Sequence, residues 1–266
     1  MPISDALEPD HIGPGIFDLT GRRILVTGAS RGLGRQLAIG LALFGATVAC
    51  VARSDDGLKQ TQSAIEAQGG RAPIYPADLS APDAIAETVA AVADDLGGLD
   101  VLVNNAAADH DSPIEETSRE TWEQVIDLNN RSAFLLAQAA SPHLQASGGY
   151  AKVVNIASIL GAVAIRDNTA YVMSKHALVG LTKALALEWS RKGVQVNALC
   201  PGFLVTDMTV HAFNDEAASK WITQRTPMGR WGQTTDFVGA AVFLASRASD
   251  FMTGQTIYVD GGWTAQ

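Results

Sequence analysis

The most regular feature of the chain is the alternation of short apolar runs with longer amphipathic stretches. The apolar runs have no polar face, so they predict strands that are buried on both sides, as in a parallel sheet covered by helices. Seven runs fit this description, at about 23–28, 47–52, 72–76, 99–106, 151–158, 194–200 and 256–262.

The stretches between the strands have helical periodicity. Gly45 is placed to end the first helix, and Ser80 is placed to cap the third. In that third helix, apolar side chains recur at intervals of three and four residues: Ile85, Val89, Val92 and Leu96. Helices are expected at about 33–44, 55–68, 80–96, 119–143, 169–191 and 235–246.

Strands that alternate with helices predict an α/β fold, a doubly wound Rossmann-type sandwich of three layers with a seven-stranded parallel sheet. Residues 1–17 contain three Pro and two Gly and are interpreted as an N-terminal arm. No internal repeat or linker interrupts the alternation after that point. Residues 18–266 are therefore expected to form a single dinucleotide-binding catalytic domain.

The composition of the chain limits the kinds of molecule that it is expected to bind. The chain has 266 residues, 47% of them hydrophobic, and a net charge of −9. An acidic protein of this kind is not expected to bind nucleic acid or an anionic membrane surface. Its two cysteines, Cys50 and Cys200, lie in apolar stretches and fit neither a disulfide framework nor a zinc site, so no metal is predicted. Without a leader-like or membrane-spanning segment, the expected location is the cytoplasm.

The first strand leads into a glycine-rich turn, "TGASRGLG", that opens the first helix. Gly28, Gly32 and Gly34 permit a tight turn, a close approach to a pyrophosphate, and close packing of helix on strand. The helix N-terminus then offers free N–H groups and a positive dipole end to the phosphates. The position between first strand and first helix indicates a dinucleotide site.

The end of the second strand indicates which dinucleotide is bound. An acid there would bind a ribose 2′-hydroxyl, but the expected position is Ala52 and the next residue is Arg53. Arg31 lies within the glycine turn, and two guanidinium groups favour a 2′-phosphate. Asp55 and Asp56 weigh against this interpretation. The prediction is NADP(H) in preference to NAD(H).

Tyr171 and Lys175 lie four residues apart on a predicted helix, and so project from the same face. Ser158 ends the fifth strand, at the sheet edge where ligands of such folds bind. A nearby ammonium favours ionisation of a phenol whose ordinary pKa is about 10. The three side chains are therefore candidates for proton transfer beside the dinucleotide.

These motifs resemble, in order, those of the short-chain dehydrogenase/reductase family over nearly the whole chain. "NNAA" at 104–107 is similar to the family's NNAG element, with Ala107 in place of glycine, and "NALCPGFLVT" resembles its PG motif. The resemblance implies that Tyr171 exchanges a proton with the substrate oxygen, which Ser158 holds. It implies that Lys175 lowers the pKa of Tyr171 and binds the ribose, and that Asn129 supports a proton-relaying water.

The same resemblance implies a set of cofactor-binding residues, including Asp78 for the adenine and Thr206 for the carboxamide. The set is Gly28, Ser30, Arg31, Gly32, Leu33, Gly34, Arg53, Asp78, Leu79, Asn105, Tyr171, Lys175, Pro201, Gly202 and Thr206.

The C-terminal third, with "GRWG" and "VDGGW", resembles members that act on sugar acids, such as gluconate 5-dehydrogenases and 2-deoxy-gluconate 3-dehydrogenases. The expected substrate is a small carbonyl or alcohol, a sugar acid or polyol. Arg166 and His110 are candidates to bind a carboxylate, and 204–226 is expected to form a lid. The alternatives are reduction of a 3-oxoacyl thioester and a cofactor-binding redox sensor without turnover. The resemblance also implies a homotetramer.

Overall fold

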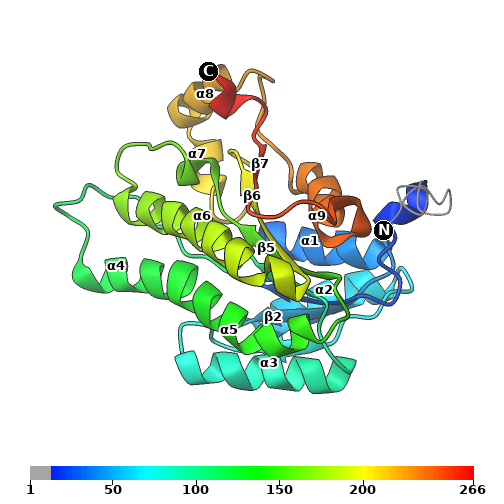
Figure 1. Ribbon diagram of the computed structural model, residues 1–266. Coiled ribbons are helices and arrows are strands. Elements are labelled where there is room, and N and C mark those ends of the chain that lie inside the picture. The colour runs from blue at the N-terminus through cyan, green and yellow to red at the C-terminus, as the bar shows by residue number, and fades with distance from the viewer. Residues whose placement is uncertain (1–12) are drawn as a thin grey trace.

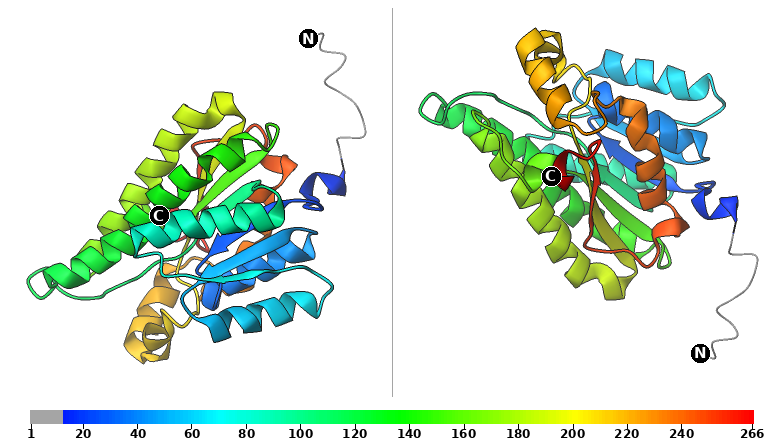
Figure 2. Two further views of the ribbon diagram at one scale, coloured as in Figure 1. Left: turned by 90° about the horizontal axis from the view of Figure 1, so that it is seen from below. Right: turned by 90° about the horizontal axis from the view of Figure 1, so that it is seen from above.

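The structure is a computed structural model that describes residues 13–266. Most of the predicted N-terminal arm lies outside the described residues. Within its described end, Pro14–Phe17 form one 3-10 turn. Two views at right angles to Figure 1 show this turn at the margin of the molecule, away from the sheet (Figure 2).

The described residues form a seven-stranded parallel sheet in the order β3-β2-β1-β4-β5-β6-β7, which confirms the predicted Rossmann-type fold. The order reverses between β1 and β4, where a crevice opens at the carboxyl ends of the strands. The strands are β1 (Arg23–Thr27), β2 (Thr47–Ala52), β3 (Ile74–Pro76), β4 (Val101–Asn104), β5 (Ala151–Ile156), β6 (Val194–Pro201) and β7 (Thr256–Val259).

Helices cover both faces of the sheet (Figure 1). Ile24 and Val26 of β1 pack with the side chains of α1, α2 and α9, whereas Leu25 packs with those of α3, α5 and α6. The unbroken apolar runs thus reflect strands buried on both sides. The helices are α1 (Gly32–Leu43), α2 (Asp55–Glu66), α3 (Pro82–Leu96), α4 (Arg119–Ile126), α5 (Ser132–Gln145), α6 (Thr169–Trp189), α7 (Val210–Asn214), α8 (Glu216–Arg225) and α9 (Val238–Ala245).

The long helix predicted at 119–143 contains a feature that periodicity did not reveal. Between α4 and α5, Asp127–Arg131 form a π-helical turn, which carries Asn129. A π turn adds a residue to one turn of a helix and is frequent at functional sites. This turn rotates the helix locally, and Asn129 is buried at 2% exposure as a result.

Two residues were predicted to mark the ends of helices, Gly45 as a stop and Ser80 as a cap. Gly45 adopts a φ of 101° just after α1, as the predicted stop requires. The predicted cap at Ser80 is wrong, because α3 begins two residues later at Pro82. The Ser80 hydroxyl instead donates to the Asp78 carboxylate at 2.8 Å and forms part of the turn after β3.

The segment 201–232 links β6 to the last helix and contains α7 and α8. Figure 2 shows α8 projecting beyond the sheet in both views. Among the described residues, no helix combines the length and the apolar character that crossing a membrane requires.

Candidate active site

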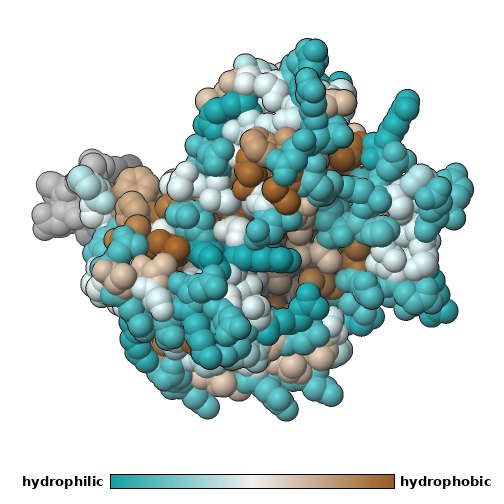
Figure 3. All heavy atoms as spheres, turned by 180° about the vertical axis from the view of Figure 1, so that it is seen from behind, coloured by the Kyte–Doolittle hydropathy of each residue, from teal (hydrophilic) through white to brown (hydrophobic). Residues whose placement is uncertain are grey.

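The loops that follow the strands enclose one large cavity of about 1010 Å³. Because parallel strands end at the same edge, the turns after β1, β4, β5 and β6 meet there. Figure 3 shows the molecule from behind, where the surface is hollowed near its centre and hydrophobic side chains are visible in the hollow. Every predicted cofactor-binding residue lines this cavity, from Gly28 in the first turn to Thr206 after β6.

The glycine turn has the geometry that its sequence requires. Gly28 adopts a φ of 68°, in the region that glycine favours. A side chain at Gly34 would collide with the Gly28 carbonyl and with the Asn105 amide. Among the described side chains, none caps the N-terminus of α1 at Arg31. The first N–H groups of this helix therefore remain free to bind a phosphate.

Asn105 fastens the turn after β4 to the turn after β1. Its Nδ2 donates to the Thr27 carbonyl at 2.8 Å, and its backbone N–H donates to Thr27 Oγ1 at 2.9 Å. Ala106 N–H donates to the same hydroxyl at 3.0 Å. The floor of the cavity is thereby fixed at the point where the strand order reverses.

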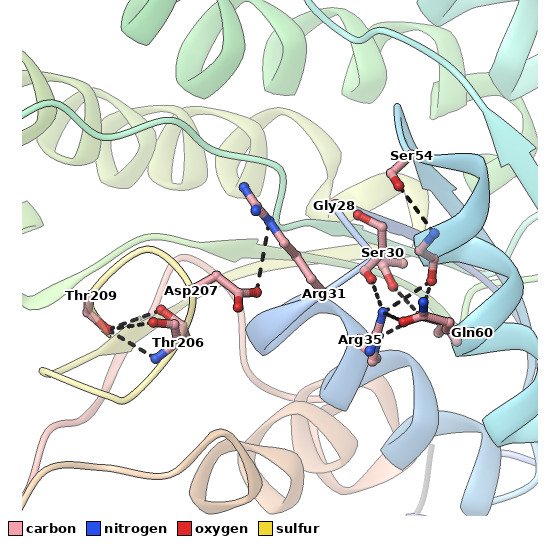
Figure 4. Close-up of polar contacts among 12 residues, drawn as sticks. Gly28, Ser30, Arg31, Arg35, Ser54, Gln60, Thr206, Asp207 and Thr209 are labelled. Carbon is pink, nitrogen blue, oxygen red and sulfur yellow. Dashed lines mark hydrogen bonds and ion pairs between the residues drawn. The ribbon is translucent and has the colours of Figure 1, made fainter. Parts of the chain in front are cut away.

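Arg31 and Arg53 both line the cavity. Arg31 Nε faces Asp207 at 4.0 Å, and both side chains are largely exposed (Figure 4). The pKa of the Asp78 carboxyl is lowered mainly by hydrogen bonds from the backbone N–H and the hydroxyl of Ser80. The positive charge of Arg53 lowers it to a smaller extent.

Arg35 also lines the cavity and was missed from sequence. Its guanidinium donates to the carbonyls of Ser30 and Gly57, to Gln60 Oε1 at 3.0 Å and to Thr61 Oγ1 at 3.1 Å (Figure 4). These bonds join the glycine turn to the start of α2. The only signal in the sequence was a second arginine four residues after Arg31.

Tyr171 and Lys175 project from one face of α6 into the other end of the cavity, next to Ser158. Lys175 Nζ lies 5.2 Å from the centroid of the Tyr171 ring and donates to the Ile156 carbonyl at 3.0 Å. Ser158 Oγ accepts the Leu160 N–H at 3.1 Å, which orients the serine at the end of β5. The structure thus brings together the three side chains that the sequence predicts.

Burial dominates the ionisation of this pair. It lowers the pKa of Lys175 to about 8, because an ammonium is poorly solvated there. It raises the pKa of Tyr171, and the Asp109 carboxylate raises it further, while the Ser158 hydroxyl has the opposite effect. The pKa of Tyr171 in the protein alone is thus shifted in the direction opposite to the expected lowering, mainly because the phenol is buried.

Asn129 has a different position from the other predicted catalytic residues. Its Oδ1 accepts the Ala108 N–H at 2.8 Å, and its Nδ2 donates to the Ala108 carbonyl and to Ser174 Oγ, both at 2.9 Å. It is fully bonded behind the cavity wall. The π turn thus uses Asn129 to join the segment after β4 to α6.

The substrate end contains side chains that sequence reasoning missed. Asp109, Asp111, Asn168 and His211 line the cavity, as does the predicted Arg166. The predicted His110 does not line the cavity. Its two acidic neighbours line the cavity instead.

The predicted lid borders the same cavity. Asp207, His211 and Trp221, from the loop after β6 and from α7 and α8, are among its lining residues. Phe203 packs against Trp231 and Trp263 with ring centroids 6.0 and 4.9 Å apart. Phe203 and Trp231 also line the cavity, so this aromatic cluster forms part of its wall. Cys50 and Cys200 are free and buried, as predicted.

Comparison with known proteins agrees with this geometry. Residues 28–264 match a family model described as enoyl-(acyl carrier protein) reductase. Gluconate 5-dehydrogenase of Gluconobacter oxydans (strain 621H) is 43% identical over 251 residues, which cover 94% of this chain and 98% of that protein. A 3-oxoacyl-[acyl-carrier-protein] reductase of Staphylococcus aureus (strain Mu50) is 39% identical, covering 90% of this chain and 96% of that one.

A solved structure is similar over the same range. The crystal structure of a gluconate 5-dehydrogenase from Burkholderia cenocepacia J2315, in complex with NADP and tartrate, superposes with a TM-score of 0.90 at 36% identity. The match covers 94% of this chain and 98% of that one.

Proposed function

Because the chain belongs to the short-chain dehydrogenase/reductase family of oxidoreductases, we propose that it interconverts a secondary alcohol and a ketone on a sugar acid or polyol, using NADP(H). The observation that carries this proposal is one cavity lined by the glycine turn at one end and by Ser158, Tyr171 and Lys175 at the other. The relatives named for gluconate support the substrate class.

In this proposal the bound nicotinamide supplies the hydride acceptor or donor. Ser158 Oγ donates a hydrogen bond to the substrate oxygen and holds it beside the Tyr171 hydroxyl. During ketone reduction, Tyr171 donates its proton to that oxygen as the carbon receives the hydride. The reverse reaction returns the proton to the phenolate. The raised pKa of Tyr171 keeps the phenol protonated in the protein alone, as donation of a proton to a ketone requires.

We assign supporting roles to Lys175 and Asn129. Lys175 would bind the ribose hydroxyls and stabilise the phenolate after proton transfer. Asn129 holds the Ala108 backbone and Ser174, so its contribution is to position α6 beside the turn after β4. A water relay through Asn129 would require its bonds to Ala108 to rearrange.

NADP(H) is preferred over NAD(H) in this proposal, because β2 ends at Ala52, without a carboxylate to bind the ribose 2′-hydroxyl. Arg53 and Arg31 both line the cavity and would supply positive charge for a 2′-phosphate. The related Burkholderia cenocepacia structure holds NADP, which also supports this preference.

We further propose a cytoplasmic homotetramer. Phe134 of α5 and Leu187 of α6 are exposed on the surface of the described chain, and so is Phe251 before β7. Exposed hydrophobic side chains on two long helices are typical of subunit contacts. Size-exclusion chromatography with light scattering should give four times the mass of one chain, and a monomer mass would contradict the proposal.

The decisive experiment is a paired screen with NADPH and NADH over keto-sugar acids, ketoses and acetoacetyl thioesters, and with NADP⁺ and NAD⁺ over polyols and aldonates. The proposal expects turnover of polyhydroxylated substrates, with NADP(H) as the better cofactor. Turnover of acetoacetyl thioesters alone would favour the 3-oxoacyl alternative, which the Staphylococcus aureus relative supports. Cofactor binding without any turnover would favour the redox sensor.

A further inference from the structure

The guanidinium of Arg35 bonds only to neutral groups. Its Nε donates to Thr61 Oγ1 at 3.1 Å, and its Nη2 donates to Gln60 Oε1 at 3.0 Å and to the Gly57 carbonyl at 3.3 Å. The same Nη2 donates to the Ser30 carbonyl in the glycine turn (Figure 4). Among the described residues, no carboxylate forms an ion pair with this guanidinium.

These bonds hold the glycine turn against the start of α2. The two segments are in close contact, because a Cβ atom at Gly57 would come within 2.8 Å of the Ser30 Cβ. Thr61 of α2 is fully buried and donates to the Ala29 carbonyl at 2.8 Å. Side chains from α1 and α2 thus bind the carbonyls of the turn at 29–30 and fix its backbone.

The positive charge of Arg35 is uncompensated at short range. The side chain is half-buried, and an ion that is partly removed from water is costly without a counter-charge. The N–H groups on its Nη1 donate to none of the described residues. Arg35 also lines the cavity. An anion with several acceptor oxygens would satisfy both the unpaired charge and the unused donors.

The other charged side chains that the turns after β1, β2 and β3 bring to the cavity are more exposed than Arg35. They are Arg31, Arg53, Asp56 and Asp78. Water and dissolved ions screen the charges of exposed side chains more strongly than those of partly buried ones. A ligand in the cavity therefore interacts with Arg35 through a less screened charge.

We propose that Arg35 is a further determinant of the preference for NADP(H), in addition to Arg31 and Arg53. It positions the glycine turn through the Ser30 carbonyl, and its Nη1 donates to the 2′-phosphate of the cofactor, which supplies the missing negative charge. The neutrality of Gln60 is essential to this role, because a carboxylate at that position would compensate the guanidinium. The inference rests on the proposed function, whose cofactor preference it explains more fully.

Gln60→Glu tests the charge and keeps the contacts, because glutamate has the shape of glutamine and still accepts the bond from Arg35. It supplies the counter-charge that the wild type lacks. The Kd of NADPH, from fluorescence titration, should rise about tenfold, whereas that of NADH, which has no 2′-phosphate, should change by less than about threefold. Gln68→Glu is the matched control, because it adds the same charge just after α2 at an exposed position outside the cavity. It should leave both constants unchanged.

Arg35→Lys and Arg35→Gln separate positioning from charge. Lysine keeps the charge but lacks the planar fork, so both cofactors should bind more weakly by a similar factor. Glutamine also removes the charge, so the ratio of the Kd of NADH to that of NADPH should fall about tenfold. Calorimetric titration with adenosine 2′,5′-bisphosphate and with 5′-AMP should show the same loss of preference, since these ligands differ only in the 2′-phosphate.

The inference is overturned if Gln60→Glu and Arg35→Gln weaken the binding of NADPH and NADH equally, which is the result of a purely structural role. It is also overturned if neither variant weakens the binding of NADPH. A wild-type protein that binds NADPH with the expected dependence on these residues, but turns over no substrate of the screen, overturns the proposed function and supports the inference.

Discussion

The two ends of the cavity are built in different ways. The cofactor end consists of strand termini and the tight turn into α1, and its central residues lie within the short segment 27–35. The substrate end combines the segment after β4, the loop before α6 and the segment 204–226 after β6, which are far apart in sequence. The cofactor end is thus determined by local geometry, and the substrate end by how distant loops pack.

This difference has a functional consequence. The phosphate-binding turn depends on glycines whose backbone conformation no other residue adopts easily. The substrate end depends on side chains of loops, such as Asp111, which can change without disturbing the sheet. Substrate preference can therefore vary while the cofactor and the chemistry stay the same.

The sharpest test of this separation is Tyr171→Phe, which removes the proton donor and keeps the ring. We expect kcat to fall by about 10²–10⁴-fold, the usual contribution of a positioned acid–base group. NADPH affinity, measured by fluorescence titration, should change by less than about threefold because the phosphate contacts are distant. Tyr150→Phe, on an exposed tyrosine, serves as control. Equal turnover in the Tyr171→Phe variant and the wild type would contradict the assignment of Tyr171 as the proton donor.

Arg53→Ala tests the cofactor end of the cavity. We expect kcat/KM for NADPH to fall by about 10–100-fold and that for NADH to change by less than about threefold, because only NADPH carries the 2′-phosphate. Arg71→Ala, outside the cavity, is the matched control. Parallel losses with both cofactors would contradict a phosphate contact.

Lys175→Met is expected to have the smallest effect. It tests the stability of the fold and not the rate of turnover. The ordinary lysine pKa of 10.5 falls to about 8 in the folded protein. Below pH 8 the ammonium is charged in both states, so its burial destabilises the fold. Between about pH 8 and 10.5 the folded state loses the proton first, and the stability of the wild type rises with pH.

The variant lacks this penalty. At pH 7 its free energy of unfolding should be roughly 1–3 kcal/mol higher than that of the wild type, reduced by the loss of the hydrogen bond to the Ile156 carbonyl. The difference should shrink as the pH approaches 10. Urea unfolding of the ligand-free protein at pH 7, 8.5 and 9.5 measures it. Lys183→Met, exposed on the same helix, should stay within about 0.5 kcal/mol of the wild type. A variant less stable than the wild type at pH 7 would show that the lysine stabilises the fold.

The sequence alone predicted the strands of the sheet, the helices that cover it and the position of the glycine turn, but not α7 or α8. Apolar runs report burial on both faces of a strand, and glycine reports a backbone that side chains exclude, so both signals are local. The pairing of Tyr171 with Lys175 was predictable for the same reason, since one helical turn fixes it.

Only the tertiary structure decided the rest. The π turn that buries Asn129 depends on packing between helices, and the raised pKa of Tyr171 depends on burial and on Asp109, 62 positions before it in the sequence. The bond from Asn168 to Asp109 and Asp111 joins segments that no local pattern relates. Contacts, solvation and charge at the substrate end arise between loops, and periodicity within one segment carries no information about them.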